Sequence, residues 1–256
     1  ALPLLLVGFW APANALSLLY GVNSAGLSDE LLRIDTGTGA STVVGNIGFA
    51  SVRGLAYDRV SDTLYGLDNS NDQLLTIDRN SGAGTVVGPV GGSFGNIQAL
   101  TFDGSGTLYG ADTSTNELVT INTATGAATS VGVLGFAGVG GLAYDTNTDE
   151  LYGVSFITDE FYTINTSTGA GTSVGSLGFG GAVGLAFDAS LGLFGADTNT
   201  DALISIVAST GAGTSIGALG VTAINGLTFV LPIPPAGLLF GSALGLLGWM
   251  RRRNFR

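Results

Sequence analysis

The sequence predicts an all-β protein, a five-bladed β-propeller whose blades are four-stranded antiparallel sheets. Three observations lead to this prediction. Two short markers recur at intervals of 42 to 45 residues, each repeat holds four short runs of alternating apolar and polar residues, and the last repeat is out of phase with the first. The 256 residues include 43 glycines and are 45% hydrophobic but 11% charged, which is typical of a turn-rich chain with a core.

The two markers define the repeat. Leu-Tyr-Gly begins at residues 19, 64, 108 and 151, and Leu-Phe-Gly begins at 193, at intervals of 45, 44, 43 and 42 residues. GLAYD or a close variant begins at residues 54, 99, 141, 184 and 226, at intervals of 45, 42, 43 and 42. Because two independent markers keep one period, the chain is predicted to consist of tandem structural units.

Each unit reads as four strands separated by turns. In the second unit these are VRGLAYD from Val52, TLYGLD from Thr63, QLLTID from Gln73 and GTVVG from Gly84. Turn sequences lie between them, such as DGSG at 103–106 and the recurring RNSGAG, TATGAA, TSTGAG and ASTGAG. In the latter group, Gly suits the left-handed conformation, and the preceding Asp78, Asn122 or Asn165 is expected to accept backbone N–H bonds.

The phase of the chain predicts how the ring closes. The first unit begins at a Leu-Tyr-Gly strand, and the last strand, Gly226 to Val230, is of the preceding type. The C-terminal strand should therefore pair with the N-terminal blade. A blade has two apolar faces that neighbours must cover, which favours a closed ring. The alternative is an open β-solenoid or a stack of hairpins, which would not need this offset.

The N-terminal residues 1–15 read as a signal peptide. ALPLLLVGFW is apolar, and Ala13-Asn14-Ala15 has the small–x–small pattern of a cleavage site, with cleavage expected after Ala15. The initiator Met and a basic region are absent, so we expect the peptide to be truncated; the alternative is a hydrophobic N-terminal strand. The propeller is then predicted to span residues 16–230.

Residues 231–256 read as a targeting tail with a C-terminal transmembrane helix. Residues 231–250 are 20 mostly apolar residues, about the length that spans a bilayer. The arginines that follow would stay on the cytoplasmic side and leave the propeller outside. The residues expected to form the sorting motif are Pro232, Pro234, Pro235, Arg251, Arg252 and Arg253.

Two resemblances extend this interpretation. Residues 18–230 resemble propeller repeats of several secreted bacterial families. The tail, with Pro-x-Pro, LLFGSALGLLG and RRR, resembles a PEP-CTERM sorting domain, although Ile233 replaces the Glu of that motif. The resemblance implies an exosortase, a membrane protease-transpeptidase of Gram-negative bacteria, as partner. It also implies export, anchoring in the inner membrane, and later display at the cell surface or release. The alternative is an ordinary C-terminal membrane anchor.

Composition excludes several functions. Residues 16–230 hold four of the eight arginines and all 19 acidic residues, a formal charge of −15, which would repel nucleic acid. The chain has no Cys, His or Lys, so thiolate and imidazole metal sites and most catalytic bases are missing. A carboxylate pair could still serve a hydrolase. The candidates Asp58, Asp145 and Asp188 recur with Asp103 in four units, as expected of a turn device.

Asp-rich loops follow the second strand of several units, at 68–72, 112–116 and 197–201. Asp68, Asp112 and Asp197 are candidates for a ligand-binding face. Asp197, Asn199 and Asp201 resemble the first half of a calcium loop, but Ala202 and Ala208 stand where its Gly and Glu belong. Asx-rich turns explain the loops without a metal, so no cofactor is predicted, and a weak structural Ca²⁺ site is the alternative.

Aromatic residues supply further candidates. Four loops between units each contain one Phe, and Val221 replaces it in the fifth. These rings could stack on sugars or could fill the gaps between blades; the second interpretation fits their regular placement. The Phe residues are Phe49, Phe94, Phe136 and Phe179. In the fourth unit, Phe156 and Phe161 replace the usual turn residues, and two exposed aromatics there would mark a partner site.

The sequence is therefore interpreted as that of an exported, non-enzymatic binding or structural module at the cell surface or in the extracellular polysaccharide matrix. Candidate partners are an exosortase-type protease, polysaccharide and surface proteins. One alternative is a propeller lyase or glycoside hydrolase using Asp or Glu, which a polar pocket with carboxylates from non-equivalent positions would favour. Another is a membrane-anchored protein–protein platform.

Overall fold

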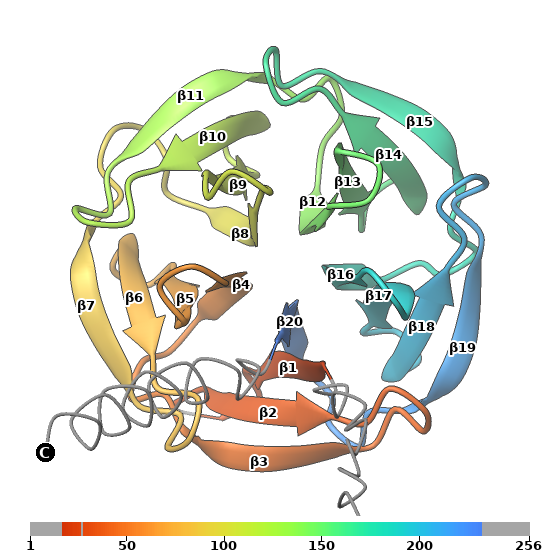
Figure 1. The fold of residues 1–256 in the computed structure, drawn as a ribbon, viewed down its shortest axis with the longest axis horizontal. Coiled ribbons are helices and arrows are strands. Elements are labelled where there is room, and N and C mark those ends of the chain that lie inside the picture. The colour runs from red at the N-terminus through yellow and green to blue at the C-terminus, as the bar shows by residue number, and fades with distance from the viewer. Residues whose placement is uncertain (1–16, 27, 232–256) are drawn as a thin grey trace, which may run out of the picture. The chain divides into compact units, whose positions relative to one another are not determined.

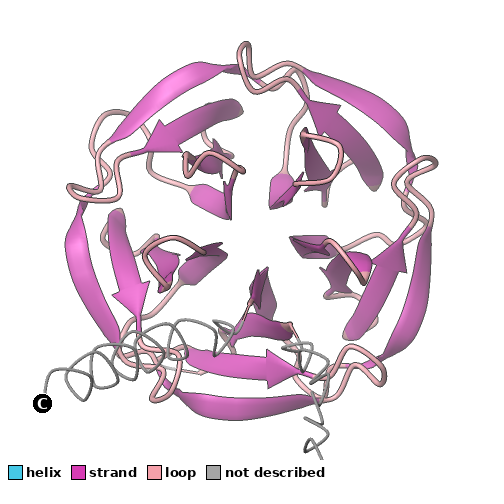
Figure 2. Cartoon of the chain, in the orientation of Figure 1, coloured by secondary structure: helices cyan, strands magenta, loops and turns pink. Residues whose placement is uncertain are grey.

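The computed structural model describes residues 17–26 and 28–231. The compact unit Leu18–Val230 forms 20 strands in five four-stranded antiparallel sheets, arranged as a ring (Figure 1). Strands are its only regular elements, and turns and loops join them (Figure 2). The predicted five-bladed propeller is confirmed.

The predicted terminal segments lie outside the described residues. These are the signal peptide at 1–15 and, except for Leu231, the tail at 231–256 with its sorting motif and transmembrane helix. Across 17–26 and 28–231, no helix is long and apolar enough to cross a membrane.

Each blade runs from an innermost strand at the axis to an outermost strand at the rim. Blade 1 is β20 (Ile224–Val230), β1 (Leu18–Asn23), β2 (Glu30–Ile34) and β3 (Ser41–Asn46). Blade 2 is β4 (Val52–Asp58), β5 (Thr63–Asp68), β6 (Gln73–Ile77) and β7 (Gly84–Pro89). Blade 3 is β8 (Ile97–Phe102), β9 (Leu108–Asp112), β10 (Glu117–Ile121) and β11 (Ala128–Val133). Blade 4 is β12 (Val139–Asp145), β13 (Glu150–Ser155), β14 (Glu160–Ile164) and β15 (Gly171–Ser176). Blade 5 is β16 (Ala182–Asp188), β17 (Gly192–Asp197), β18 (Ala202–Ile206) and β19 (Gly213–Ala218).

The ring closes as predicted, because the C-terminal strand completes the N-terminal blade. β20 pairs antiparallel with β1, from Leu18 opposite Val230 to Asn23 opposite Ile224. The first and last strands of the propeller therefore share one ladder of hydrogen bonds, and this sheet joins the two ends of the ring.

Glycines form the seams between blades at the rim. Gly82 of blade 2 has a φ of 81°, and a Cβ added there would lie 2.6 Å from the carbonyl oxygen of Gly45 in blade 1. Only a residue without a side chain permits this approach and this conformation. The seam is also bridged by a hydrogen bond of 2.9 Å from the N–H of Gly84 to the carbonyl of Ile47. The corresponding glycine pairs are Gly39 with Gly217, Gly126 with Gly88, Gly169 with Gly132, and Gly211 with Gly175.

The turns between the third and fourth strands have the predicted Asx chemistry. Asp78 Oδ1 accepts the backbone N–H groups of Asn80 and Ser81 at 2.9 and 2.8 Å, and Asn122 and Asn165 do the same in their turns. Hydrogen bonds, chiefly from the backbone of Ser81, lower the pKa of Asp78. These exposed Asp and Asn side chains thus shape the turns that carry the seam glycines.

Candidate ligand-binding sites at the propeller axis

The five innermost strands, counted as seven positions with Asp103 added after the six-residue β8, share one sequence pattern at six of these positions. The first position is apolar and the second is variable. The third is Gly or Ala, the fourth is Leu, the fifth is Ala or Thr, the sixth is aromatic, and the seventh is Asp or Val. Because these strands lie nearest the axis (Figure 1), the pattern sets what surrounds the centre of the ring.

The middle of the axis is filled. The leucines at the fourth position are at most 2% exposed, and they are Leu55, Leu100, Leu142, Leu185 and Leu227. Beside them, a Cβ added to Gly226 would lie 2.8 Å from the backbone nitrogen of Leu55. The innermost strands therefore touch through their backbones. A cavity lies on the side of the first-to-second-strand turns, and the residues at the second position of the innermost strands lie on the side of the second-to-third-strand loops.

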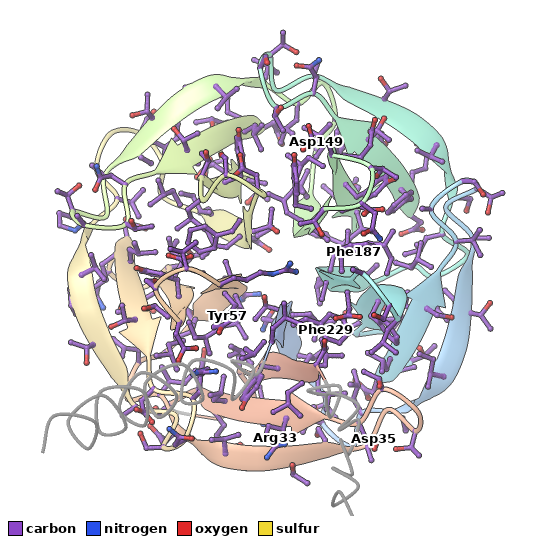
Figure 3. The ribbon with its side chains drawn as sticks, viewed as in Figure 1. Arg33, Asp35, Tyr57, Asp149, Phe187 and Phe229 are labelled. Atoms are coloured by element: carbon purple, nitrogen blue, oxygen red, sulfur yellow. The ribbon has the colours of Figure 1, made fainter. Side chains whose placement is uncertain are left out.

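The first of these, the turn-side cavity, has a volume of about 370 Å³. It ends at Leu100, Leu185 and Leu227 and opens between the first-to-second-strand turns. Aromatic residues from the sixth position of every blade line it, namely Tyr57, Phe102, Tyr144, Phe187 and Phe229. Figure 3 labels three of them around the centre of the ring. Its size is within the range of small-molecule sites.

The aromatic walls of the cavity are braced by neighbouring blades. Phe102 lies against Tyr65 of blade 2 with ring centroids 5.6 Å apart, and Phe229 meets Phe194 of blade 5 edge-on at 5.5 Å. These pairs join the Leu-Tyr-Gly strand of one blade to the innermost strand of the next. The recurrence of both markers therefore reflects one contact between blades.

Two tyrosines of the wall are tied to the turns. The hydroxyl of Tyr57 donates to Asp62 at 2.6 Å, and Arg79 pairs with the same oxygen at 2.6 Å while lying 5.4 Å from the Tyr57 ring centroid. Burial, followed by the hydrogen bond to Asp62, raises the pKa of Tyr57 to about 12. Tyr144 donates to Asp149, and burial likewise raises its pKa. Both phenols stay neutral at ordinary pH.

The predicted catalytic carboxylates serve as turn residues. Asp58 and Asp103 line the cavity, but Asp58 accepts from the N–H of Val60 at 2.8 Å, and Asp103 accepts from the N–H groups of Ser105 and Thr107. Asp145 and Asp188 are 7% and 4% exposed. They accept from the N–H groups of Asn147 and Ser190. All four occupy one position of the repeat, as expected of a structural device.

On the loop side, the three aspartates predicted as a ligand face are buried. Asp68, Asp112 and Asp197 are each 0% exposed, so the expectation that they face a ligand is wrong. Their oxygens hold the loops together: Asp197 accepts from the N–H of Gly181 at 3.0 Å and from the N–H of Thr200 at 2.9 Å. Asp112 and Asp197 thereby fasten the connection before the innermost strand to the loop that follows the second strand, while Asp68 accepts from its own loop and from Gln73.

Phe156 and Phe161, the two aromatic residues predicted as a partner site in the fourth blade, differ in exposure. Phe161 is 0% exposed and stacks on Tyr152 with centroids 5.0 Å apart, so the prediction of two exposed aromatics is wrong for Phe161. Phe161 and the following Tyr162 are both buried, because neighbouring blades cover both faces of this strand. Phe156 is half-buried and lies beside Gly140, where an added Cβ would approach its ring to 3.0 Å. In this blade Ser155 Oγ takes the loop-holding role of the aspartates, accepting from the N–H groups of Ile157 and Thr158.

The calcium candidate does not gather a cluster of carboxylates. Asp197 already accepts from the N–H groups of Gly181 and Thr200, while Asp201 has a φ of 51° at the turn into β18. Across residues 17–26 and 28–231, no group of three or more acidic side chains is placed to hold a metal ion.

The phenylalanines between units lie at the seams. Phe136 stacks on Tyr162 with centroids 3.6 Å apart and 6° between the rings. A Cβ added to Gly84 or Gly213 of the next outermost strand would approach Phe49 or Phe179 to 2.9 Å. Their contacts match the gap-filling interpretation. Sequence reasoning missed the aromatic ring of the turn-side cavity, although the recurring Tyr or Phe of GLAYD was its signal.

Comparisons with known proteins agree with this fold. The model of a repeat of unknown function (DUF6923) matches residues 53–227. A chain of the nidogen/laminin complex superimposes with a TM-score of 0.62 at 16% identity, covering 86% of this chain and 82% of that one. A structural genomics protein of unknown function from Bacteroides thetaiotaomicron gives 0.59 at 19% identity, covering 80% of this chain and 56% of that one. None of the curated proteins matches the sequence.

Proposed function

The chain belongs to the DUF6923 family, a repeat of unknown function, and from this premise we propose that it is an exported, non-enzymatic binding module that takes a carbohydrate into its turn-side cavity. The observation that carries the proposal is the lining of that cavity. Aromatic side chains from five blades surround a space of about 370 Å³, and Asp58, Asp103 and Arg59 stand at its edge.

This lining matches the chemistry of a sugar. The carbon-bound face of a sugar ring packs on aromatic rings, while its hydroxyls need planar polar groups that donate and accept. Phe102, Tyr144 and Phe187 are half-buried, so part of each ring is open to the cavity. Arg59 is exposed and can donate to hydroxyls, and Thr101 and Thr228 add hydroxyl groups to the wall.

The symmetry of the lining supports binding rather than catalysis. A glycosidase needs two carboxyl groups in different roles at a set separation. Here Asp58 and Asp103 occupy one position of the repeat, and both already accept hydrogen bonds from their own turns. The fold is also compatible with contacts to other proteins, since the similar chain comes from a nidogen/laminin complex.

A glycan array probed with the full chain tests the proposal, followed by calorimetric titration of the glycans that bind. Substituting Phe187→Leu removes the aromatic face and should weaken binding about fivefold. Arg59→Ala should weaken it by a similar factor, roughly one hydrogen bond. The matched control is Arg33→Ala, an exposed arginine at the rim (Figure 3), which should leave affinity unchanged. Absence of any glycan binding, or equal binding by Phe187→Leu, would overturn the proposal.

Export and sorting form a second part of the proposal. The supporting observation is the tail, whose prolines Pro232, Pro234 and Pro235 precede an apolar run and three arginines. We expect this segment to anchor the chain in the inner membrane until an exosortase-type protease removes it. Cell fractionation with mass spectrometry of the mature C-terminus tests this: a cleaved surface form supports sorting, an intact membrane form supports a permanent anchor, and a full-length cytosolic protein contradicts both.

A further inference from the structure

We propose that the loop-side end of the axis is a second binding site, which takes the carboxylate of a sugar acid through Arg53. The site lies at the opposite end of the axis from the turn-side cavity, with the leucines at the fourth position of the innermost strands between them. The proposal does not depend on the function assigned to that cavity. It rests on residues that depart from an otherwise regular repeat.

The second position of the innermost strands is the one that differs in every blade. Its residues are Asn225, Arg53, Gln98, Gly140 and Val183 in blades 1 to 5. The neighbouring positions keep an apolar residue on one side and Gly or Ala on the other. A ring of five equivalent strands does not need five different residues here for folding. The variation therefore points to a role that is specific to this end of the axis.

Arg53 brings a guanidinium group with free donors to this ring. It is half-buried, and its Nη1 donates to Asn225 Oδ1 at 2.7 Å, the one hydrogen bond of this side chain among the described residues. In the same part of the chain the only ion pair joins Arg79 to Asp62, so Arg53 has no carboxylate partner there. A guanidinium can make two parallel hydrogen bonds to a carboxylate, and most of its donors are available for them.

Asp29, the carboxyl group whose pKa the charge of Arg53 influences, is already held by other donors. Asp29 is 1% exposed and accepts from the N–H of Val52 at 2.6 Å and from the Ser24 hydroxyl at 2.8 Å. Burial raises the pKa of Asp29, although the charge of Arg53 acts in the opposite direction. Arg53 therefore influences Asp29 through space without being consumed by a direct ion pair.

Amide groups of blades 2 and 3 lie at the same end of the axis as Arg53. Gln98 Nε2 and Asn69 Nδ2 both donate to Asn96 Oδ1, at 3.3 and 3.1 Å. Asn69 Oδ1 is buried and has no hydrogen-bond partner in the described structure. A buried acceptor without a donor is unfavourable, and a ligand hydroxyl would supply the missing hydrogen bond. The loop-side end of the axis thus offers a guanidinium for a carboxylate and an unpaired amide oxygen for a hydroxyl.

The opposite side of the ring is apolar. The residue following the second strand is small and polar in four blades, as Ser24, Asn69, Thr113 and Thr198, and it is Phe156 in blade 4. All five donate a backbone N–H to the connection before the innermost strand, so they are equivalent in the fold. Phe156 and Val183 both lie close to Gly140, where an added Cβ would be 3.0 and 3.2 Å from them.

This division into a charged, amide-rich side and an aromatic side matches a sugar acid. The carboxylate would meet Arg53, the hydroxyls would meet the amides, and a ring face would pack on Phe156. Inorganic phosphate would use Arg53 without needing Phe156, and a peptide would meet Arg53 through its terminal carboxylate without offering hydroxyls to Asn69.

Calorimetric titration of the full chain with a uronic acid disaccharide tests the site. We expect this probe to bind at least about tenfold tighter than the same disaccharide with its carboxylates reduced to alcohols. Arg53→Gln, which introduces the residue of blade 3, should lower the affinity for the acidic probe by at least about tenfold. Phe156→Thr, which introduces the residue of blades 3 and 5, should weaken it about fivefold.

Two controls separate this site from the turn-side cavity and from misfolding. Arg33→Gln removes an exposed arginine outside the ring and should bind the acidic probe as the parent chain does. A loss of binding in Phe187→Leu as large as that in Arg53→Gln would place the probe in the turn-side cavity and overturn the proposal. Circular dichroism melting checks that each variant folds. If Arg53→Gln does not fold, Gln98→Val provides a second substitution in the same ring. The proposal is overturned if the probe does not bind, or if phosphate, a short peptide or the reduced disaccharide binds as tightly. Unchanged binding by Arg53→Gln would overturn it as well.

Discussion

The seams between blades and the loop-side ring at the axis follow opposite rules. Each seam pairs the same residue types five times, with a left-handed glycine of one blade against a glycine of the preceding outermost strand. The loop-side ring presents five different residues at one structural position. Repetition marks what every blade needs in order to pack. Departure from it marks where the molecule needs chemical differences, which a symmetric ring cannot supply.

The largest effect is expected at a seam. Gly82→Val should lower the free energy of unfolding by roughly 4 kcal/mol, because a β-branched residue is forced into a left-handed conformation and against the Gly45 carbonyl. Urea denaturation measures the change. Gly104→Ala is the control, since nothing lies within 4 Å of its added Cβ. Equal stability of the two variants would show that the seams do not determine closure.

A smaller loss of stability is expected for substitution of the leucines at the fourth position of the innermost strands. Leu185 is 1% exposed at the end of the turn-side cavity, and Leu185→Ala should cost about 3 kcal/mol through lost burial and an enlarged cavity. Thermal and urea denaturation measure the loss. Leu191→Ala is the comparison, because Leu191 is 49% exposed and should change stability little. Similar losses at the two positions would contradict a filled axis.

A still smaller loss of stability is expected for substitution of a buried aspartate in the loop after a second strand. Asp197→Ala should destabilise the fold by about 2 kcal/mol, because the N–H groups of Gly181 and Thr200 lose their acceptor. Asp197→Ser should recover part of the loss, since Ser155 accepts from two N–H groups at the same position of blade 4. If serine is no better than alanine in urea denaturation, these hydrogen bonds do not explain the burial of Asp197.

The dependence of stability on pH should differ between a buried carboxylate and an exposed one. Burial raises the pKa of Asp29 above 3.8, so its contribution to stability is greatest below that pH and declines as pH rises through the folded value. Hydrogen bonds from Thr38 lower the pKa of Asp35, whose contribution is present above 3.8 and lost as pH falls. Relative to the parent chain, Asp29→Asn should therefore gain stability with rising pH and Asp35→Asn should lose it. Urea midpoints between acid and neutral pH give the two slopes, and equal slopes would contradict this assignment.

The smallest effect on stability is expected at the loop-side ring. Arg53→Gln should change the free energy of unfolding by about 0.5 kcal/mol or less, because the side chain is half-buried and the new amide can still donate to Asn225. Thermal denaturation measures it. A loss as large as that of Gly82→Val would place Arg53 among the structural residues and remove the contrast between seam and ring.

Much of the fold could be predicted from the sequence because blade structure is a local matter. The spacing of Leu-Tyr-Gly and GLAYD indicated five units, the turns with Asp78, Asn122 and Asn165 indicated hairpins, and the phase of residues 226–230 indicated closure. Each of these depends on side-chain alternation or on turn chemistry within a few residues. The regular placement of the Phe residues between units likewise indicated packing at the seams.

The candidate sites could not be read in this way. Asp68, Asp112 and Asp197 looked exposed because aspartates in loops usually are, but all three are buried. Asp112 and Asp197 accept from the connections before the innermost strands, and Asp68 accepts from its own loop and from Gln73. Phe161 looked like a surface aromatic because the loop before it is irregular, yet it is buried because neighbouring blades cover both faces of β14. Arg53 and Phe156 lie in different blades, and no local signal brings them to one end of the axis.

By itself, the sequence determined the number of blades, their strand order and the partner of the last strand, since these follow from periodicity and from covering apolar faces. Only the tertiary structure decided which polar groups are buried, where the leucines separate the two ends of the axis, and which non-repeating residues share a ring. Those outcomes depend on the closure of five blades around one axis, which brings together residues that are far apart in the chain.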